Sequence, residues 1–279
     1  MTETEREPNQ PEANAAPPVE TIFPVDEHVE EIQVGDQKVR RKGIYLLPNL
    51  FTTGALFSGF YATVAATQHN FEHAAIALIV AGILDGLDGR IARLTNTSSE
   101  FGVQYDSMSD LVSFGVAPSI LMFNWALVLL GKLGWAIAFA YVACAALRLA
   151  RFNAQVKTAD KRYFVGLASP AAAGLIATMV WTGFDVDVGG GLALLVGMVT
   201  LGVALLMVSN VRYQSMKGID FRGRVPFVFI LVMVMLFAII TIDPPRVLLL
   251  IGVLYAASGP LQTLFRIGFK RFGKEKSAQ

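Results

Sequence analysis

Apolar stretches of about 20 residues recur along most of this chain, and they constrain its fold more than any other feature. A stretch of this length is what an α-helix needs to cross the hydrocarbon core of a bilayer. Hydrophobic residues make up 54% of the 279 residues and charged residues only 16%, which is far more apolar than a soluble domain. The sequence therefore predicts an all-α, polytopic membrane protein with about eight transmembrane helices, at residues 45–67, 72–93, 107–130, 134–152, 164–182, 191–209, 225–242 and 247–265.

The first 43 residues differ from the rest of the chain. They are acidic and rich in proline, and they contain few large apolar residues. Such a segment cannot bury enough apolar surface to fold alone, so we expect a disordered tail in which only residues 32–39 could order locally. It lacks the basic start and the cleavage site of a signal peptide, so we expect it to remain on the mature protein.

Lysine and arginine lie on one side of the predicted spans. With the tail in the cytoplasm, all 23 of them except Lys132 and Arg246 fall in cytoplasmic segments. This distribution follows the positive-inside rule. We therefore expect both termini to be cytoplasmic, together with the connections between the second and third, fourth and fifth, and sixth and seventh spans.

One polar run interrupts the apolar pattern at the predicted cytoplasmic face. It reads Asp85-Gly-Leu-Asp88-Gly-Arg-Ile-Ala-Arg93 and continues, after eight residues, as Gly102-x-x-x-Asp106-x-x-x-Asp110. Charged groups near the hydrocarbon are costly, so a cluster of them indicates a function. Aspartates three or four positions apart share one face of a helix. A short polar connection should make the two helices antiparallel neighbours, so the four carboxylates should converge.

Four carboxylates in one small volume repel one another unless a cation lies between them. Mg²⁺ and Mn²⁺ suit such all-oxygen sites, and Mg²⁺ usually shares its site with substrate phosphates. We expect one or two such ions, which would activate the phosphorus of a pyrophosphate. Simpler readings remain open at this point: Asp85 and Asp88 could be solvated acids at a helix end, and the glycines could serve only close helix packing.

The motif D-x-x-D-G-x-x-A-R-x8-G-x-x-x-D-x-x-x-D is similar to the signature of the CDP-alcohol phosphatidyltransferases, and every specified position is filled. The resemblance implies transfer of a phosphatidyl group from CDP-diacylglycerol to an alcohol, with release of CMP. It implies that Asp110 is both a metal ligand and the general base for the acceptor hydroxyl. It further implies that the other metal ligands are Asp85, Asp88 and Asp106, and that Gly89, Arg93 and Gly102 line the cytidine diphosphate site.

The resemblance also implies an architecture and a setting. We expect a six-helix catalytic core within residues 44–210, a cytoplasmic loop and two added helices in residues 211–266, and a basic cytoplasmic end at 267–279. The protein would be a homodimer in the bacterial cytoplasmic membrane with its active site facing the cytoplasm. It would bind no nucleic acid.

The acceptor alcohol is a separate question. Segments at 45–54, 112–118, 148–153, 166–173 and 212–221 resemble the branch of this family that uses L-serine, with Ala168 where that branch has proline. Serine needs a cation for its carboxylate. Arg148 and Arg151, three positions apart, can face one cleft, and Asn153 follows them, although positive-inside topology explains the arginines equally well. Asn49 and Thr52 could contact the pyrophosphate, or Pro48-Asn49 could only start a helix.

Three other acceptors remain open: glycerol 3-phosphate, choline and an inositol phosphate. A different class of protein is an ion-coupled transporter, in which aspartates would bind a coupling ion near the bilayer midplane. The aspartates here cluster at one edge of the predicted spans and the chain shows no evident inverted repeat, which favours the transferase.

Overall fold

The computed structural model describes residues 29–34, 37–42, 46–94, 100–155, 163–214 and 227–276. The chain divides after Ile44 into two units. The first unit contains an antiparallel pair of strands, β1 (Val29–Val34) and β2 (Gln37–Lys42). This pair spans residues 32–39, the part of the predicted disordered tail for which local order was expected. Residues 1–28 of that tail lie outside the described residues.

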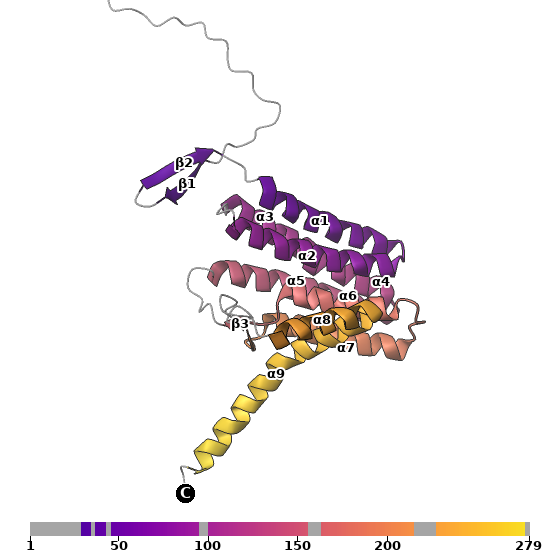
Figure 1. The fold of residues 1–279 in the computed structure, drawn as a ribbon. Helices are drawn as coiled ribbons and strands as arrows, with labels where there is room; N and C mark the ends of the chain where they lie inside the picture. The colour runs from indigo at the N-terminus through magenta and orange to yellow at the C-terminus, as the bar shows by residue number, and fades with distance from the viewer. Residues whose placement is uncertain are drawn as a thin grey trace, which may run out of the picture. The chain divides into compact units, whose positions relative to one another are not determined.

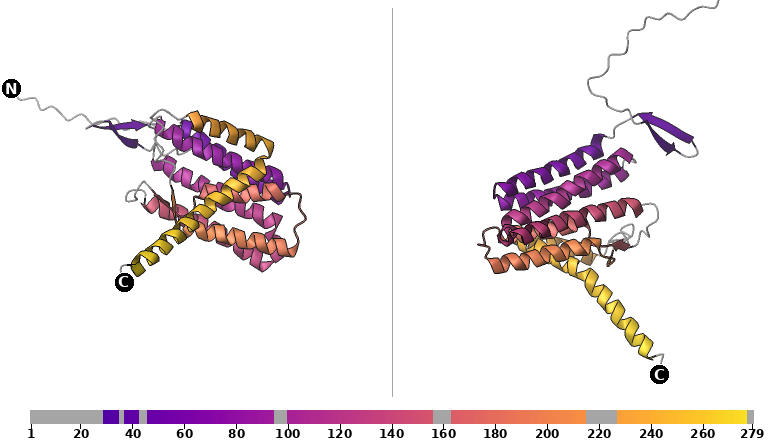
Figure 2. Two further views of the ribbon diagram at one scale, coloured as in Figure 1. Left: turned by 60° about the horizontal axis from the view of Figure 1, so that its bottom comes forward. Right: turned by 180° about the vertical axis from the view of Figure 1, so that it is seen from behind.

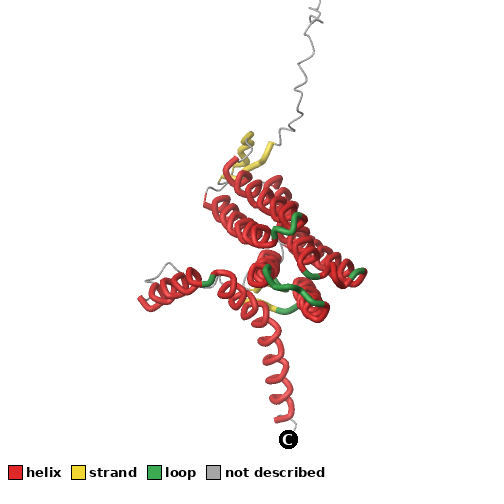
Figure 3. Tube along the Cα trace, turned by 90° about the vertical axis from the view of Figure 1, so that its right-hand side faces the viewer, coloured by secondary structure: helices red, strands yellow, loops and turns green. Residues whose placement is uncertain are grey.

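The second unit is built from helices (Figures 1 and 3). Its first half contains α1 (Leu46–Thr67), α2 (Phe71–Leu94), α3 (Glu100–Asp110), the π-helix η1 (Leu111–Val116), α4 (Ala117–Trp125) and the 3-10 helix η2 (Leu127–Leu130). Its second half contains α5 (Lys132–Gln155), α6 (Ser169–Gly183), α7 (Gly190–Val208), α8 (Phe227–Ile242) and α9 (Pro244–Lys276). Two short strands also belong to this half: β3 (Tyr163–Val165) follows α5 and β4 (Arg212–Gln214) follows α7. They pair with each other in an antiparallel manner.

Small side chains line the contact between α1 and α2. On α1 the buried residues include Ala62, Ala65 and Ala66, and on α2 they include Ala74 and Ala75, none of them more than 3% exposed. Small side chains let two helix backbones approach closely, and this is how helices gain van der Waals contact in a membrane. The resulting pair places the end of α2 beside the start of α1, where the aspartate run lies.

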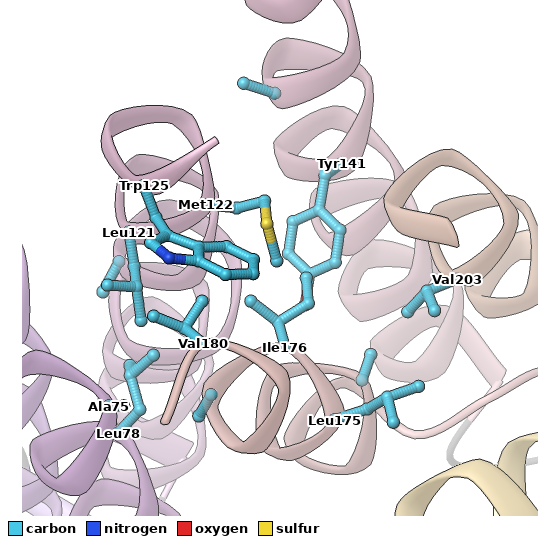
Figure 4. Close-up of a cluster of buried hydrophobic side chains, with 14 of the residues drawn as sticks. Ala75, Leu78, Leu121, Met122, Trp125, Tyr141, Leu175, Ile176, Val180 and Val203 are labelled. Carbon is cyan, nitrogen blue, oxygen red and sulfur yellow. The ribbon is translucent and has the colours of Figure 1, made fainter. Parts of the chain in front are cut away.

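Larger side chains fill the centre of the second unit (Figure 4). Leu121, Met122 and Trp125 of α4 meet Tyr141 of α5 and Ile176 of α6 there. The indole Nε1 of Trp125 also donates a hydrogen bond of 3.1 Å to the carbonyl of Gly183. This packing fixes α4, and with it the α3–η1 segment that precedes α4 in the chain.

Four helices within the described ranges are long and apolar enough to cross a bilayer: Pro48–Thr67, Lys132–Ala154, Gly190–Val208 and Pro244–Thr263. A shorter apolar helix covers Leu231–Ile242. Each residue from Leu231 to Phe237 leaves at least 37% of its surface exposed. Continuous apolar exposure of this kind indicates contact with lipid. The helical, membrane-embedded class is therefore supported, while four of the eight predicted spans meet these length and hydropathy requirements.

The predicted span at 107–130 is a succession of helical types. The end of α3, η1, α4 and η2 together fill it. The π-helix η1 begins directly after Asp110, and its residues Ser113, Phe114 and Gly115 are buried. Single turns of π-helix are rare and are found frequently at functional sites.

Candidate active site

Three of the four predicted metal ligands meet at one point. Asp85 and Asp88 come from the last turns of α2, and Asp106 comes from α3. One carboxylate oxygen from each residue lies within 4.8 Å of the corresponding oxygens of the other two. Hard divalent cations take carboxylate ligands at separations of this kind. The spacing in the sequence therefore predicted the convergence of two helix ends correctly.

Asp110 joins this group through Asp85. The two carboxyl groups lie next to each other, and Asp106 and Asp88 add their negative charges to the environment of Asp110. Asp110 lies one turn after Asp106, at the last position of α3. All four aspartates consequently share one acidic cluster, which comprises Asp85, Asp88, Asp106 and Asp110.

Asp106 shows that the cluster suits a cation. Among the described residues its Oδ1 atom is buried and has no hydrogen-bond partner. Burial, and then the negative charges of Asp88 and Asp85, raise the pKa of the Asp106 carboxyl to about 7. A buried carboxylate oxygen without a partner is costly, and a divalent cation would satisfy it. The donor set of the acidic cluster thus fits Mg²⁺ or Mn²⁺.

Thr52 of α1 connects the two helices of the acidic cluster. Its hydroxyl lies 2.8 Å from Oδ2 of Asp88 and donates a hydrogen bond to it. Its backbone carbonyl accepts a hydrogen bond of 3.2 Å from the hydroxyl of Ser109, the residue before Asp110. Thr52 is only 4% exposed. We predicted it as a pyrophosphate contact, and the structure shows it holding a predicted metal ligand.

Two further contacts hold α3 and η1 against α1. Thr53 and Tyr105 share a hydrogen bond of 2.9 Å between their hydroxyl groups. Ser113 of η1 donates a hydrogen bond of 3.1 Å to the carbonyl of Ala55. Sequence reasoning did not find Tyr105 or Ser109, because a hydroxyl on a helix gives no spacing signal. Asn49 is half-buried, and its carbonyl accepts a hydrogen bond from Thr53 within α1.

Glycine at positions 86 and 89 is not required by helix packing. A Cβ atom added at Gly86 or Gly89 would meet no described atom within 4 Å. The packing alternative for these two glycines is therefore not supported, and the open space beside Gly89 can admit a ligand. Gly102 lies in the first turn of α3 and is half-buried. Arg93 belongs to α2, and its side chain lies outside the described residues.

The three polar residues near the end of α5 have partners on three different elements. Arg148 donates from Nη1 to the hydroxyl of Ser169 at 2.7 Å and interacts electrostatically with Asp110. Arg151 donates to the carbonyl of Val208 and to Oδ1 of Asn210, at 3.3 and 2.7 Å. The Nδ2 atom of Asn153 donates to the hydroxyl of Ser107 at 2.9 Å. Of the three, Arg148 is the one joined electrostatically to the acidic cluster.

Comparison with known proteins agrees with this geometry. The sequence profile of the CDP-alcohol phosphatidyltransferase family matches residues 45–208. A CDP-diacylglycerol–serine O-phosphatidyltransferase of Helicobacter pylori (strain J99) is 37% identical over 237 residues, which cover 84% of this chain and 98% of that protein. The Bacillus subtilis (strain 168) enzyme of the same name is 32% identical over 171 residues, covering 61% of this chain and 91% of that protein.

A third relative is the archaetidylserine synthase of Methanothermobacter thermautotrophicus, which is 33% identical over 180 residues, or 62% of this chain and 71% of that protein. The profile match includes all of α1 to α7, and it therefore contains every residue of the acidic cluster. The chain belongs to the CDP-alcohol phosphatidyltransferase family.

Proposed function

We propose that this protein transfers the phosphatidyl group of CDP-diacylglycerol to the hydroxyl of L-serine, which yields phosphatidylserine and CMP. The observation that carries the proposal is the convergence of Asp85, Asp88 and Asp106 around the buried, unpartnered Oδ1 atom of Asp106. The choice of serine is supported by the names of the relatives in Helicobacter pylori and Bacillus subtilis. Glycerol 3-phosphate, choline and an inositol phosphate are the alternative acceptors.

The acidic cluster divides its tasks among its members. Asp85, Asp88 and Asp106, with Asp110 beside them, would hold Mg²⁺ or Mn²⁺, and we expect two ions. When bound, the metal neutralises the charge of the pyrophosphate and makes its phosphorus easier to attack. Thr52 keeps Asp88 in place through its hydrogen bond. Loss of a residue that orients a metal ligand in this way typically costs about 10- to 100-fold in metal affinity or activity.

Asp110 is the proposed general base. It accepts the proton of the serine hydroxyl while the serine oxygen bonds to the phosphorus that bears the diacylglycerol. The bond between that phosphorus and the oxygen of CMP breaks, and CMP leaves with the electron pair. Asp85 lies beside Asp110 in the acidic cluster. No covalent intermediate with the protein is needed in this scheme.

The remaining site residues are assigned to the substrates. Gly89 and Gly102 would let the cytidine diphosphate approach the backbone closely, and Arg93 would pair with its phosphate oxygens. Asn49 lies one turn before Thr53 on α1 and would face the same ligand. Arg148 is the proposed partner of the serine carboxylate, because its guanidinium interacts electrostatically with Asp110, the proposed base for the serine hydroxyl. Arg151 and Asn153 would support it by fixing the end of α5.

The proposed setting is the bacterial cytoplasmic membrane. We propose eight spans, with the catalytic core in residues 44–210, an added pair of spans in residues 211–266, and the acidic tail and residues 267–279 in the cytoplasm. CDP-diacylglycerol would enter laterally from the bilayer and serine from the cytoplasm. A homodimer is expected from the family resemblance.

Release of CMP by the purified protein tests this proposal. CDP-diacylglycerol is supplied with L-serine, glycerol 3-phosphate, choline or an inositol phosphate in separate reactions with Mg²⁺ or Mn²⁺. We expect release with serine to exceed release with every other alcohol by at least tenfold. Faster release with another alcohol would transfer the assignment to that acceptor, and no alcohol-dependent release would contradict the enzyme class.

A further inference from the structure

The last helix, α9, packs against the helix α6 and the strand β4 through two glycines. A Cβ atom added at Gly252 would lie 3.2 Å from Cδ1 of Leu175 on α6. One added at Gly259 would lie 2.5 Å from Cζ of Tyr213, in the strand β4. Side chains cannot approach that closely, so glycine is needed at position 259. Both α9 and β4 lie beyond residue 208, where the family match ends.

A proline inside α9 supplies the acceptor for this docking. Pro260 has no backbone N–H, so the carbonyl of Ala256, four residues earlier, cannot receive its usual helical hydrogen bond. The hydroxyl of Tyr213 donates to that carbonyl at 3.0 Å instead. Tyr213 is only 1% exposed, so its hydroxyl has its partner away from water. The proline and the buried tyrosine therefore fix α9 in one place along the bundle.

Tyr255 lies one residue before the carbonyl that receives this bond. Its ring packs against the ring of Tyr213, with 5.5 Å between the centroids. Tyr255 is half-buried, and its phenol interacts electrostatically with the guanidinium of Arg148. The docking of α9 thus brings a phenol hydroxyl from outside the matched core into the environment of the cation proposed for the acceptor.

Arg148 has hydrogen-bonding capacity left. Its Nη1 atom donates to Ser169, while its Nε atom is buried and has no partner within the described part of the chain. A guanidinium has five N–H donors and binds carboxylates with two parallel hydrogen bonds. A buried N–H without a partner is costly. A carboxylate at this position would satisfy the guanidinium, which also interacts electrostatically with Asp110, the proposed base.

We propose that Tyr255 is an acceptor-binding residue, whose hydroxyl donates a hydrogen bond to the carboxylate of the acceptor alongside the guanidinium of Arg148. On this account α9 is part of the acceptor site, and Tyr213, Gly259 and Pro260 hold it in register. The inference rests on the proposed function, because it requires an acceptor with a carboxylate. Tyr213 belongs to the segment 212–221 that resembles the serine-using branch, and Tyr255 lies within the predicted span 247–265, but the sequence predicted no role for either side chain.

The variant Tyr255→Phe removes the hydroxyl and keeps the ring that packs on Tyr213. We expect the KM for L-serine to rise about tenfold, as for the loss of a hydrogen bond to a charged group. The KM for CDP-diacylglycerol and the unfolding midpoint in detergent should not change. The matched control is Tyr61→Phe, because Tyr61 on α1 is 43% exposed, and it should leave every constant at the wild-type value.

Serine amide lacks the carboxylate charge. Comparing it with serine distinguishes a role of Tyr255 in binding the carboxylate from a role in stabilising the fold. The wild-type protein should prefer serine to serine amide, and Tyr255→Phe should reduce this preference by about the factor by which it raises the KM for serine. An unchanged KM for serine would overturn the inference. An equal rise of both KM values with a lower unfolding midpoint would also overturn it, because it would show a purely structural role.

Failure of the proposed function would be seen in the wild-type protein. If wild-type protein released no CMP in the presence of serine, the acceptor assignment and this inference would both be wrong. If wild-type protein used serine and Tyr255→Phe matched it in every constant, the inference alone would be wrong.

Discussion

Asp110 is the residue on which the proposed chemistry depends most. It lies beside Asp85 and interacts electrostatically with Arg148. Replacing Asp110 with asparagine keeps the shape of the side chain and removes its ability to accept a proton. We expect serine-dependent CMP release by Asp110→Asn to fall by a factor of about 100 to 10,000, with an unfolding midpoint no lower than that of the wild type.

The control for this prediction is Asp187→Asn, because Asp187 is an exposed aspartate between α6 and α7. Its rate should equal that of the wild type. If Asp110→Asn retained full activity in the same assay, Asp110 could not be the general base.

Thr52 allows the metal site to be tested without changing a ligand. The variant Thr52→Val keeps the volume of the side chain and removes the hydrogen bond to Asp88. Loss of a residue that orients a metal ligand costs about 10- to 100-fold in metal affinity. We therefore expect half-maximal CMP release to need that much more Mg²⁺, with the maximal rate partly restored at high metal concentration.

Thr63→Val is the matched control, because the hydroxyl of Thr63 bonds only to the carbonyl of Gly59 in its own helix among the contacts described. Its metal requirement should be that of the wild type. A wild-type metal requirement for Thr52→Val would show that Asp88 does not need this support.

The residue types of the acidic cluster were predictable, and their partners were not. Spacings of three and four placed each pair of aspartates on one helix face, and their convergence is confirmed for Asp85, Asp88 and Asp106. The bond from Thr52 to Asp88 depends on how α1 packs on α2, which one sequence does not specify. Arg148 and Arg151 share a spacing of three, yet their hydrogen-bond partners lie on different elements, because long side chains diverge from neighbouring Cα positions.

The π-helix η1, which begins directly after Asp110, packs closely against α1. A Cβ atom added at Gly59 would lie 2.5 Å from Oγ and 2.7 Å from Cα of Ser113. The backbone of η1 would have to move to admit it. We expect Gly59→Ala to lower the free energy of unfolding by about 1–3 kcal/mol, measured in detergent, and to lower the rate as well, because η1 begins directly after Asp110.

The variant Gly202→Ala on α7 tests whether the loss of stability expected for Gly59→Ala comes from the close contact between Gly59 and Ser113. A Cβ atom at Gly202 would meet nothing within 4 Å among the described atoms. This variant should be as stable as the wild type or slightly more stable, since alanine favours a helix over glycine. Equal stabilities for the two variants would contradict the proposed role of Gly59.

The sequence predicted those helices whose positions follow from the length of an apolar stretch alone. The length of their apolar stretches correctly indicated that α5, α7 and the first part of α9 are long and apolar enough to cross a membrane. The π-helix was not predicted, because the apolar residues of 107–130 show no break where η1 begins. The β3–β4 pair was also missed, since each strand has only three residues. The mid-helix Pro260 gave no sign of its role, because its effect depends on a tyrosine 47 positions away in the sequence.

The whole molecule is proposed to span the membrane eight times with its active site on the cytoplasmic side. Two further views show the helices of the second unit packed alongside one another, with the end of α9 continuing past the bundle (Figure 2). The distribution of lysine and arginine, and not the contacts between helices, is the basis of the orientation. An experiment on intact cells can therefore test it independently of the enzyme assay.

Cysteine labelling measures this orientation. In a Cys144→Ala background the chain has no native cysteine. A membrane-impermeant maleimide added to intact spheroplasts should label Asp187→Cys, between α6 and α7, and should label Lys161→Cys only after permeabilisation. Labelling of Lys161→Cys in intact spheroplasts would place the connection between α5 and α6 outside and would contradict the proposed topology.

The central claim is that the acidic cluster holds a divalent metal and uses it to transfer a phosphatidyl group to serine. The most direct test measures CMP and phosphatidylserine formed by purified wild-type protein as serine and metal are varied. We predict one CMP for each phosphatidylserine, no release without serine, loss of release with a chelator, and recovery with Mg²⁺ or Mn²⁺. Serine-dependent CMP release that continued unchanged in the presence of the chelator would contradict the account.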